Sequence, residues 1–492
     1  MNTGPKPTTR TSGIAPFNRL NHRDRKPSNG LDVESRISRQ DPFPPSQEGH
    51  IPTVDHKRHR SIKGIHPDGE SGRKGIHPLN FLSICCRSTC TASKYANFLW
   101  PFVPAAIAIH FARPDLHLWI FVLNYIAMVP AANLVGFAGQ ELARKLPKVF
   151  GVIFETTIGS VVELILFMVL IKKGEQSIPV IKAAILGSIL ANLLLCLGMC
   201  FFVGGMRRDE QEFHEAISEA GTGLMLVAGM GLVVPAAFST ALTGSTTLTV
   251  TQASLAASIL EISRATAVVL LIAYAAHVFF QMRTHHSLYE DILETDEHKE
   301  KDEGLHKDPS KTRLTFTECV IALLFAVTCV ALIAVFLVEQ IENIVQERGI
   351  SDSFMGLILV PLVEKTAEHL TAIDEAWDNQ TNHALSSVLG ASVQTALLST
   401  PLVVLVGWGL NRKMDLNFEL FDAVVLILAI LVVGNFLRDG KSNYLEGLLC
   451  ILVYFIIAIA AFFYPNPIRS EGTAAGGGVA PMEHAKRLLT TT

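Results

Sequence analysis

Two glutamates stand inside long apolar stretches of this 492-residue sequence. Glu163 lies within the apolar run 149–171, and Glu368 lies within the run 353–376. A carboxylate at the centre of a bilayer costs about 2.5–3.5 kcal/mol on insertion scales, so we expect neither side chain to face lipid. A pair of buried carboxylates can hold a metal cation, and each can take up a proton when the cation has left. We therefore interpret Glu163 and Glu368 as the metal ligands of a site that binds cations and protons in turn.

Further along the chain, each glutamate is followed by a stretch of small residues with hydroxyl and amide side chains. Hard cations prefer oxygen ligands of this kind, and small residues let helices pack closely. Beside the two glutamates, we predict that the cation and proton site includes Ser188, Asn192, Ser392 and Gln394 from these stretches, and Ser160, one helical turn before Glu163.

Three more residues near Glu368 could change how the site works. Glu364 and Lys365 precede it by one helical turn and share its face of the helix. A lysine there places a positive charge at the site, which repels a divalent ion twice as strongly as a monovalent one. We predict that both residues modify selectivity, unless Lys365 is neutral or paired with Glu364. His369 could pass protons, although a histidine that packs between helices is an equally good interpretation.

The elements that must position these residues are membrane helices. Apolar residues make up 49% of the chain and charged residues 17%, against roughly 25% charged in soluble domains. A spanning helix needs about twenty apolar residues. Such runs lie near 97–112, 116–137, 149–171, 178–203, 221–239, 250–280, 315–338, 353–376, 384–409, 417–436 and 444–464. The sequence predicts an all-α polytopic membrane protein of about eleven transmembrane helices.

The glutamate motifs recur in two halves of the chain. Setting the first span aside leaves five predicted helices in each half, an odd number that inverts the second half relative to the first. The predicted fold is therefore one helix plus two inverted five-helix repeats, with the site at their interface. The predicted parts are a disordered basic cytosolic tail (1–95), the first helix and first exchanger repeat (96–280), an acidic cytosolic loop (281–313), the second exchanger repeat (314–466) and a flexible tail (467–492).

Loop charges predict the orientation. Lys and Arg are more frequent in the loops that share a side with the amino terminus, which favours a cytosolic amino terminus. No apolar core of a cleavable signal is visible in the first ten residues, so the first spanning helix should direct insertion. The acidic loop 281–313 fits either a solvated linker or a regulatory helix that senses cations.

Other functional classes find little support. The sequence contains no Gly-x-Ser-x-Gly, phosphate-loop or His-Glu-x-x-His motif, so we expect no enzyme activity and no cofactor. The basic tail lacks interleaved aromatic residues, which argues against nucleic acid as a partner. A channel would need a pore filter, whereas inverted repeats favour alternating access. The expected partners are calcium or monovalent cations, protons and the lipid bilayer. The sequence does not indicate an oligomeric state.

Over residues 95–465 the sequence resembles the calcium/proton exchanger branch of the calcium/cation antiporter superfamily, and its vacuolar fungal and plant members in particular. The resemblance rests on residues 180–194 (VIKAAILGSILANLL), 233–238 (VVPAAF), 263–266 (SRAT), 414–418 (MDLNF) and 439–447 (DGKSNYLEG). It implies eleven helices, a cation site made by the two acidic motifs, and calcium import into an acidic vacuole in exchange for protons.

The site motif departs from that family, which has Gly-Asn-x-x-Glu in both halves. Ser160 replaces the asparagine of the first motif, and Glu364 and Lys365 replace the glycine and asparagine of the second. Three functions therefore stay open. The chain is a calcium/proton exchanger in which Glu364 offsets Lys365, a sodium or potassium/proton antiporter, or a non-transporting paralogue that acts as a regulatory membrane protein.

Overall fold

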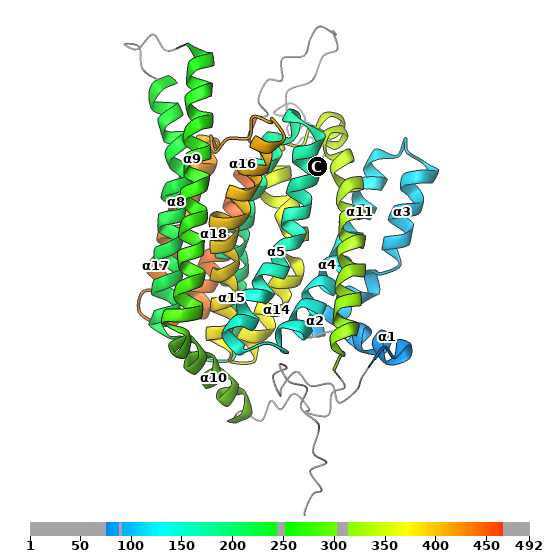
Figure 1. Ribbon diagram of the computed structural model, residues 1–492, viewed down its shortest axis with the longest axis vertical. Coiled ribbons are helices and arrows are strands. Elements are labelled where there is room, and N and C mark those ends of the chain that lie inside the picture. Colours follow the sequence, from blue (N-terminus) through cyan, green and yellow to red (C-terminus); the bar gives the residue numbers. More distant parts are fainter. Residues whose placement is uncertain (1–74, 88–90, 244–250, 303–312, 466–492) are drawn as a thin grey trace, which may run out of the picture. The chain divides into compact units, whose positions relative to one another are not determined.

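The computed structural model describes residues 75–87, 91–243, 251–302 and 313–465. All of the described residues belong to one compact unit, which lies within His59–Thr492. Most of the tail predicted for 1–95, and the tail predicted for 467–492, lie outside the described residues. The all-α fold is confirmed, because helices make up nearly all of the described chain (Figure 1).

The helices of the first half are α1 (Pro78–Arg87), α2 (Thr91–Ala96), η2 (Asn97–Leu99), α3 (Phe102–Ala112), α4 (His117–Ala143), α5 (Lys148–Lys173), η3 (Glu175–Ser177), α6 (Ile178–Leu190), η4 (Ala191–Cys196), α7 (Leu197–Gly205), α8 (Glu215–Thr243), α9 (Gln252–Phe279) and η5 (Phe280–Thr284). Those that follow are α10 (His286–Asp302), α11 (Phe316–Arg348), α12 (Asp352–Phe354), η6 (Met355–Leu359), α13 (Val360–Glu364), α14 (Thr366–Trp377), α15 (Thr381–Gln394), η7 (Thr395–Ser399), α16 (Thr400–Gly409), α17 (Leu420–Phe436) and α18 (Tyr444–Phe462). Two short strands, β1 (Gln211–Glu212) and β2 (Lys441–Ser442), pair antiparallel.

Nine helical segments of the described chain are long and apolar enough to cross a membrane. They are 93–112, 117–143, 149–173, 175–205, 215–243, 252–284, 316–348, 381–409 and 444–462. The predicted span 417–436 coincides with α17, which is apolar but shorter, and the span 353–376 with the interrupted series α12 to α14. Every predicted span therefore falls on helix, while the count of eleven and the inversion of the repeats remain predictions.

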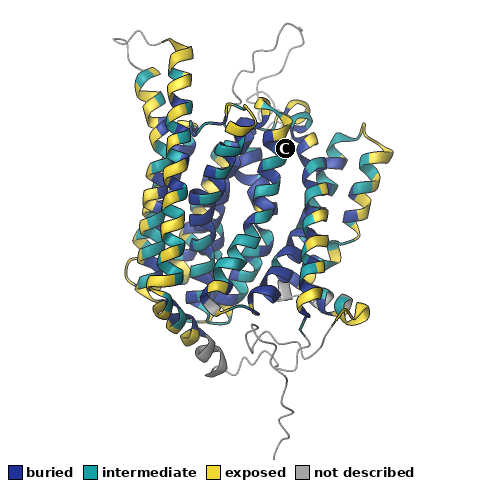
Figure 2. Ribbon diagram, in the orientation of Figure 1, coloured by how far each residue is buried: buried dark blue, intermediate teal, exposed yellow. Residues whose placement is uncertain are grey.

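The helices that follow the glutamate motifs form the centre of the bundle. Within the most apolar part of each span, 83% of the residues are buried in 175–205 and 78% in 381–409, against 22% in 252–284. Figure 2 shows the same contrast, with buried residues on the inner helices and exposed residues along α8 and α9. Exposed apolar residues on outer helices are what a lipid-facing surface requires.

Both central spans depart from regular α-helix at similar places. The first contains the π-helical segment η4 and the second contains η7, each in the middle of an otherwise α-helical span. Such π-helical turns free backbone groups from the regular pattern and are frequent at functional sites.

Two helices of the bundle cross closely at Gly187 of α6, because a Cβ atom there would overlap the backbone carbonyl of Leu357 in η6. Glycine thus lets the two backbones meet at this crossing.

Three of the sequence strings that carry the family resemblance meet at one place. The Lys182 ammonium of α6 pairs with the Asp415 carboxylate and also donates to the carbonyl of Asn417, 3.0 Å away. The Leu416 amide donates to the hydroxyl of Ser263, at 2.9 Å. These contacts fasten the connection before α17 to α6 and α9, so the shared strings have a structural role away from the glutamates.

The predicted disorder of the tail up to residue 95 is wrong for its described part. Residues 78–87 and 91–96 form α1 and α2. The Ser93 hydroxyl donates to the Asn133 side-chain oxygen at 2.5 Å, and the Asn133 amide donates to the Ser93 carbonyl at 3.2 Å. These bonds hold α2 against α4, an effect of tertiary packing that the polar local sequence does not reveal.

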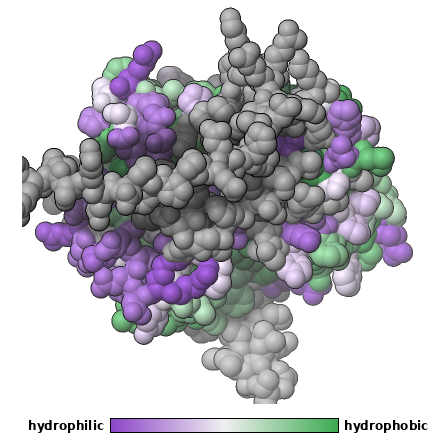
Figure 3. Space-filling model, turned by 90° about the horizontal axis from the view of Figure 1, so that it is seen from below, coloured by the Kyte–Doolittle hydropathy of each residue, from purple (hydrophilic) through white to green (hydrophobic). Residues whose placement is uncertain are grey.

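The acidic loop 281–313 is also more ordered than a solvated linker. Most of its described part forms α10, in which Tyr289, Ile292 and Leu293 are buried. The Asp296 carboxylate, with 1% of the residue exposed, accepts hydrogen bonds from the Asn382 backbone and side-chain nitrogens, both at 2.8 Å. Asp296 therefore caps the amino-terminal end of α15. Figure 3 shows the end of the molecule at which α10 lies in Figure 1, seen from below, with many hydrophilic residues beside hydrophobic ones.

Candidate cation and proton site

Glu163 lies on α5 and is completely buried against the second half of the chain. The Thr395 hydroxyl is 3.2 Å from Oε1 and 2.9 Å from Oε2 of Glu163, and the Ser399 hydroxyl is 3.4 Å from Oε2. Both hydroxyls belong to η7, one helical turn apart, so they face the carboxylate together. The π-helical turn of η7 thus presents two hydroxyl donors to a buried carboxylate.

Lys365 lies between the two predicted cation-binding glutamates. Its Nζ is 3.5 Å from Oε2 of Glu163 and 3.4 Å from Oε2 of Glu368, and its side chain is 1% exposed. Lys365 stands where the helix is interrupted between α13 and α14. A buried ammonium needs anionic partners to offset the loss of its hydration, and the two glutamates provide them.

Glu368, near the start of α14, is less enclosed than Glu163. Its side chain is 22% exposed, whereas that of Glu163 is 0% exposed. The Glu368 carboxylate packs against Gly159 of α5, where a Cβ atom would overlap Oε1 of Glu368. The glycine of the first motif therefore makes room for the glutamate of the second.

Glu364 does not take the role of partner to Lys365. It is 2% exposed, and neither of its carboxylate oxygens has a hydrogen-bond partner in the described chain. The charges of Glu163, Lys365 and Glu368 are near enough to act on it. The ion pair between Glu364 and Lys365 that would offset the lysine is not formed, since Lys365 contacts the other two glutamates instead.

His369 connects the two halves of the chain. Its Nε2 lies 3.0 Å from the side-chain oxygen of Asn192, which is in the π-helical segment η4. Both residues are buried. The side-chain nitrogen of Asn192 has no hydrogen-bond partner among the described residues. Because the histidine follows Glu368 directly in sequence, this contact links η4 to the helix that carries the second glutamate.

Residues 116–283 and 319–463 match the model of a family described as "Sodium/calcium exchanger protein", and together they make up more than half of the chain. The chain belongs to this exchanger family. The exchanger is 35% identical over 381 residues to "Vacuolar cation/proton exchanger 5" of Arabidopsis thaliana, covering 77% of this chain and 83% of the relative. It is 32% identical to the "Vacuolar calcium ion transporter" of Schizosaccharomyces pombe, covering 76% and 86%.

Solved structures agree with the family assignment of the exchanger. "Structure of native YfkE" superimposes with a TM-score of 0.59 at 26% identity, covering 74% of this chain and 100% of that one. "Crystal Structure of H+/Ca2+ Exchanger CAX" gives a TM-score of 0.53 at 14% identity, covering 76% and 92%, which supports the fold alone. The predicted resemblance and the helical membrane fold are confirmed.

The remaining predicted site residues of the exchanger are buried but do not bind the glutamates directly. In the described chain, none of the side chains of Ser160, Ser188, Ser392 and Gln394 forms a hydrogen bond with Glu163 or Glu368. The hydroxyls of Ser160 and Ser392 donate to carbonyls of their own helices. The Ser188 hydroxyl and the Gln394 amide nitrogen have no hydrogen-bond partner in this part of the chain. The Ser188 oxygen remains available to a bound ion or water, whereas the Gln394 nitrogen can donate only to an acceptor such as water.

Two residues that contact Glu163 were missed in the sequence. Thr395 directly follows the predicted Gln394, and Ser399 lies four positions later. The spacing of one helical turn between two hydroxyl residues beside a predicted ligand was the available signal.

Within the described residues, no group of three or more His, Cys, Asp or Glu side chains is arranged to hold a metal ion. At the predicted site, the place between the two carboxylates is taken by Lys365.

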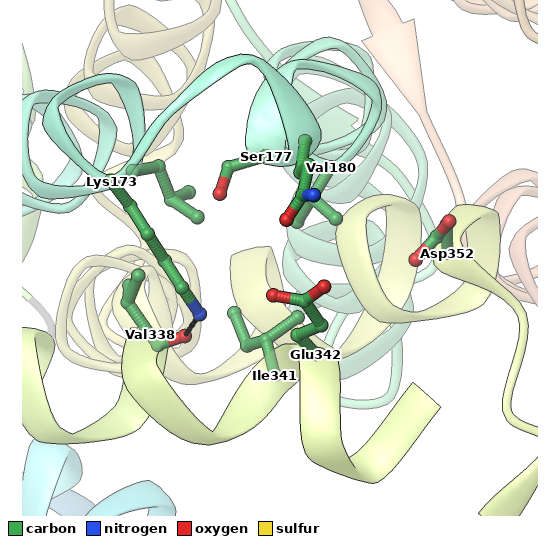
Figure 4. Close-up of a pocket in the computed structure, with 9 residues that line it drawn as sticks. Lys173, Ser177, Val180, Val338, Ile341, Glu342 and Asp352 are labelled. Atoms are coloured by element: carbon green, nitrogen blue, oxygen red, sulfur yellow. Dashed lines mark hydrogen bonds between the residues drawn. The ribbon is translucent and has the colours of Figure 1, made fainter. Parts of the chain in front are cut away.

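A separate pocket of the exchanger lies away from these residues. It is formed by residues of α5, η3, α6, α11 and α12 and includes Lys173, Glu342 and Asp352 (Figure 4). The Lys173 ammonium donates to the carbonyl of Val338, at 2.9 Å. None of the predicted site residues lines this pocket. The candidate site is therefore the buried charged group formed by Glu163, Glu364, Lys365 and Glu368.

Proposed function

We propose that this exchanger is a secondary active cation/proton antiporter in which Glu163 and Glu368 carry the cation and the protons in turn. One observation carries the proposal. Two carboxylates from different halves of the chain converge on a single cationic group, the Lys365 ammonium, at 3.5 Å and 3.4 Å. A place that suits one positive charge between these two carboxylates suits a metal cation by the same electrostatics.

Cation/proton exchange follows because cations and protons compete for the same two carboxylates, Glu163 and Glu368. A buried carboxylate is costly when it is ionised and unpaired, so each glutamate is stable with a proton or with a cation beside it. If the site opens to one side of the membrane at a time, release of protons on one side and uptake of cation on the other become linked. The hydroxyl and amide oxygens of Ser160, Ser188, Asn192, Ser392 and Gln394 supply further ligands in this proposal, and Thr395 and Ser399 position Glu163.

We infer the transported cation and the membrane from the names of the relatives. One is called a vacuolar cation/proton exchanger and another a vacuolar calcium ion transporter. On that basis we assign calcium as the cation, carried into an acidic organelle in exchange for protons. The exchanger would lie in the vacuolar membrane with a cytosolic amino terminus and would have no enzyme activity. Sodium or potassium exchange, or a regulatory role without transport, are the alternatives.

Proton release from acid-loaded vesicles tests this function. The purified full-length chain is reconstituted into liposomes that contain a pH-sensitive dye at acidic pH, and calcium, sodium or potassium is added outside. We expect calcium to raise the internal pH, with no response in liposomes that lack the protein. If none of the three cations changes the internal pH in vesicles shown to contain folded protein, the regulatory alternative replaces the antiporter.

A further inference from the structure

The Lys365 ammonium occupies the place that a transported cation would need. Its Nζ is almost equally distant from Glu163 and Glu368, and its side chain is 1% exposed. A metal ion held by both carboxylates has to lie between them, because its attraction to both is strongest there. The ammonium and the metal ion therefore cannot occupy this place together.

The neighbouring carboxyl group does not draw the lysine away from this place. Glu364 directly precedes Lys365 in the sequence and is buried like it. Its oxygens nevertheless accept no hydrogen bond from Lys365 or from any other described residue. The ammonium is committed to Glu163 and Glu368 in this structure, and an entering cation must displace it.

When an entering cation displaces the Lys365 ammonium, the positive charge of the lysine still lies near the binding site. Lys365 is anchored at the helix interruption three residues before Glu368, so its ammonium stays within reach of the ion. Two positive charges at short distance repel, and the repulsion energy is proportional to the charge of the ion. A divalent cation therefore loses twice the binding free energy that a monovalent cation loses at the same place.

We infer that Lys365 is the selectivity-determining residue of this exchanger, a tethered cation that competes for Glu163 and Glu368 and disfavours divalent relative to monovalent ions. The inference rests on the proposed function and refines its substrate class. Calcium then binds more weakly here than at a site with asparagine in place of the lysine. Sodium and potassium are affected less, so their exchange relative to calcium is increased.

The test compares half-saturating cation concentrations in the proton-release assay. The parent is measured beside Lys365→Asn, which restores the family residue, and Lys365→Arg, which keeps the charge. Lys441→Asn, at the exposed pair of strands, is the control for loss of a lysine elsewhere. In Lys365→Asn we expect tighter binding of both ions, with a clearly larger fold gain for calcium than for sodium, because the cost of displacing the ammonium is the same for both ions whereas the relieved repulsion is twice as large for calcium. Lys365→Arg should keep the preference of the parent.

Equal fold gains for calcium and sodium, or no gain for calcium, would overturn the inference. Because Lys365→Asn leaves two buried carboxylates without their ammonium, the double variant Glu364→Gly/Lys365→Asn is measured as well and should show the same change in preference. A second readout, the rise in thermal unfolding temperature on adding calcium in detergent, does not need transport. Absence of proton release in every variant would refute the antiporter, whereas a calcium-dependent rise that is no larger without Lys365 would refute the competition.

Discussion

The Lys365 ammonium and the Glu163 carboxylate, from different halves of the chain, lie 3.5 Å apart, and their side chains are 1% and 0% exposed. Such a contact stabilises the packing of the two halves only while both partners are present, since a buried charge without its partner is costly. The same contact fills the place between the glutamates. Stability and ion binding therefore depend on one side chain.

Thr395 holds the Glu163 carboxylate by the shorter of its hydroxyl contacts, at 2.9 Å. Thr395→Val keeps the shape of the side chain but removes this donor. A hydrogen bond to a charged group contributes about 1.5–3 kcal/mol, so we expect a lower thermal unfolding temperature and a higher half-saturating cation concentration. Thr366→Val is the matched control, because the Thr366 hydroxyl donates to the backbone carbonyl of Leu362 in its own helical segment. Transport equal to the parent in Thr395→Val would show that the hydroxyl does not position Glu163.

Gly159 leaves the space that the Glu368 carboxylate occupies. Gly159→Ala puts a methyl group there, so the carboxylate must move away from Lys365. We expect slower cation-driven proton release, with a destabilisation of about 1–3 kcal/mol, as is usual when a packed site is overfilled. Gly223→Ala on α8 is the control, because a Cβ atom there meets nothing within 4 Å. If Gly159→Ala and Gly223→Ala exchange equally well, the position of Glu368 is not critical.

The sequence predicted the helices well and the side-chain contacts only in part. Spanning segments are defined by local composition, and each predicted span falls on helix. Glu163 and Glu368 were identified because a carboxylate within an apolar spanning helix is energetically costly and therefore indicates a functional site. Of the two partners of Lys365, helix spacing indicates Glu368, three residues later, but says nothing of Glu163 on another helix.

Short polar elements were missed for a related reason. Helix α2 has no apolar period and is held by the contacts of Ser93 with Asn133 on α4. For the acidic loop, its many charged residues left a solvated linker and a regulatory helix both open, and neither interpretation indicated that Asp296 binds the end of α15. Both features depend on residues distant in sequence, so local composition does not reveal them.

His369 offers a way to separate proton transfer from packing. Its Nε2 lies 3.0 Å from the Asn192 side-chain oxygen. His369→Gln can still donate to that oxygen but cannot pass a proton as imidazole does, whereas His369→Leu loses both functions. We expect His369→Gln to keep the thermal stability of the parent and to exchange more slowly, and His369→Leu to be less stable as well. Full exchange in His369→Gln would assign the histidine to packing alone.

Asp296 connects the acidic helix α10 to the membrane bundle. Asp296→Ala removes the acceptor for the Asn382 nitrogens and for the His383 amide, which is 3.2 Å away. Loss of a helix cap costs about 0.5–2 kcal/mol, so we expect faster hydrogen exchange in α10 and at the start of α15. Asp291→Ala, at an exposed position of the same helix, should leave exchange unchanged. Equal protection in both variants would mean that α10 is held by its apolar residues.

Coupling of the two ion movements is the most direct test of antiport through Glu163 and Glu368. Radioactive calcium uptake and proton release are recorded together in the same acid-loaded liposomes, for the parent and for Glu163→Gln. We predict that the parent accumulates calcium to a higher free concentration inside than outside while protons leave, that this accumulation is lost when an ionophore has collapsed the proton gradient beforehand, and that Glu163→Gln loses both uptake and release. Calcium that only equilibrates with the outside concentration in the presence of the proton gradient, or full coupled exchange in Glu163→Gln, would contradict the mechanism proposed for these glutamates.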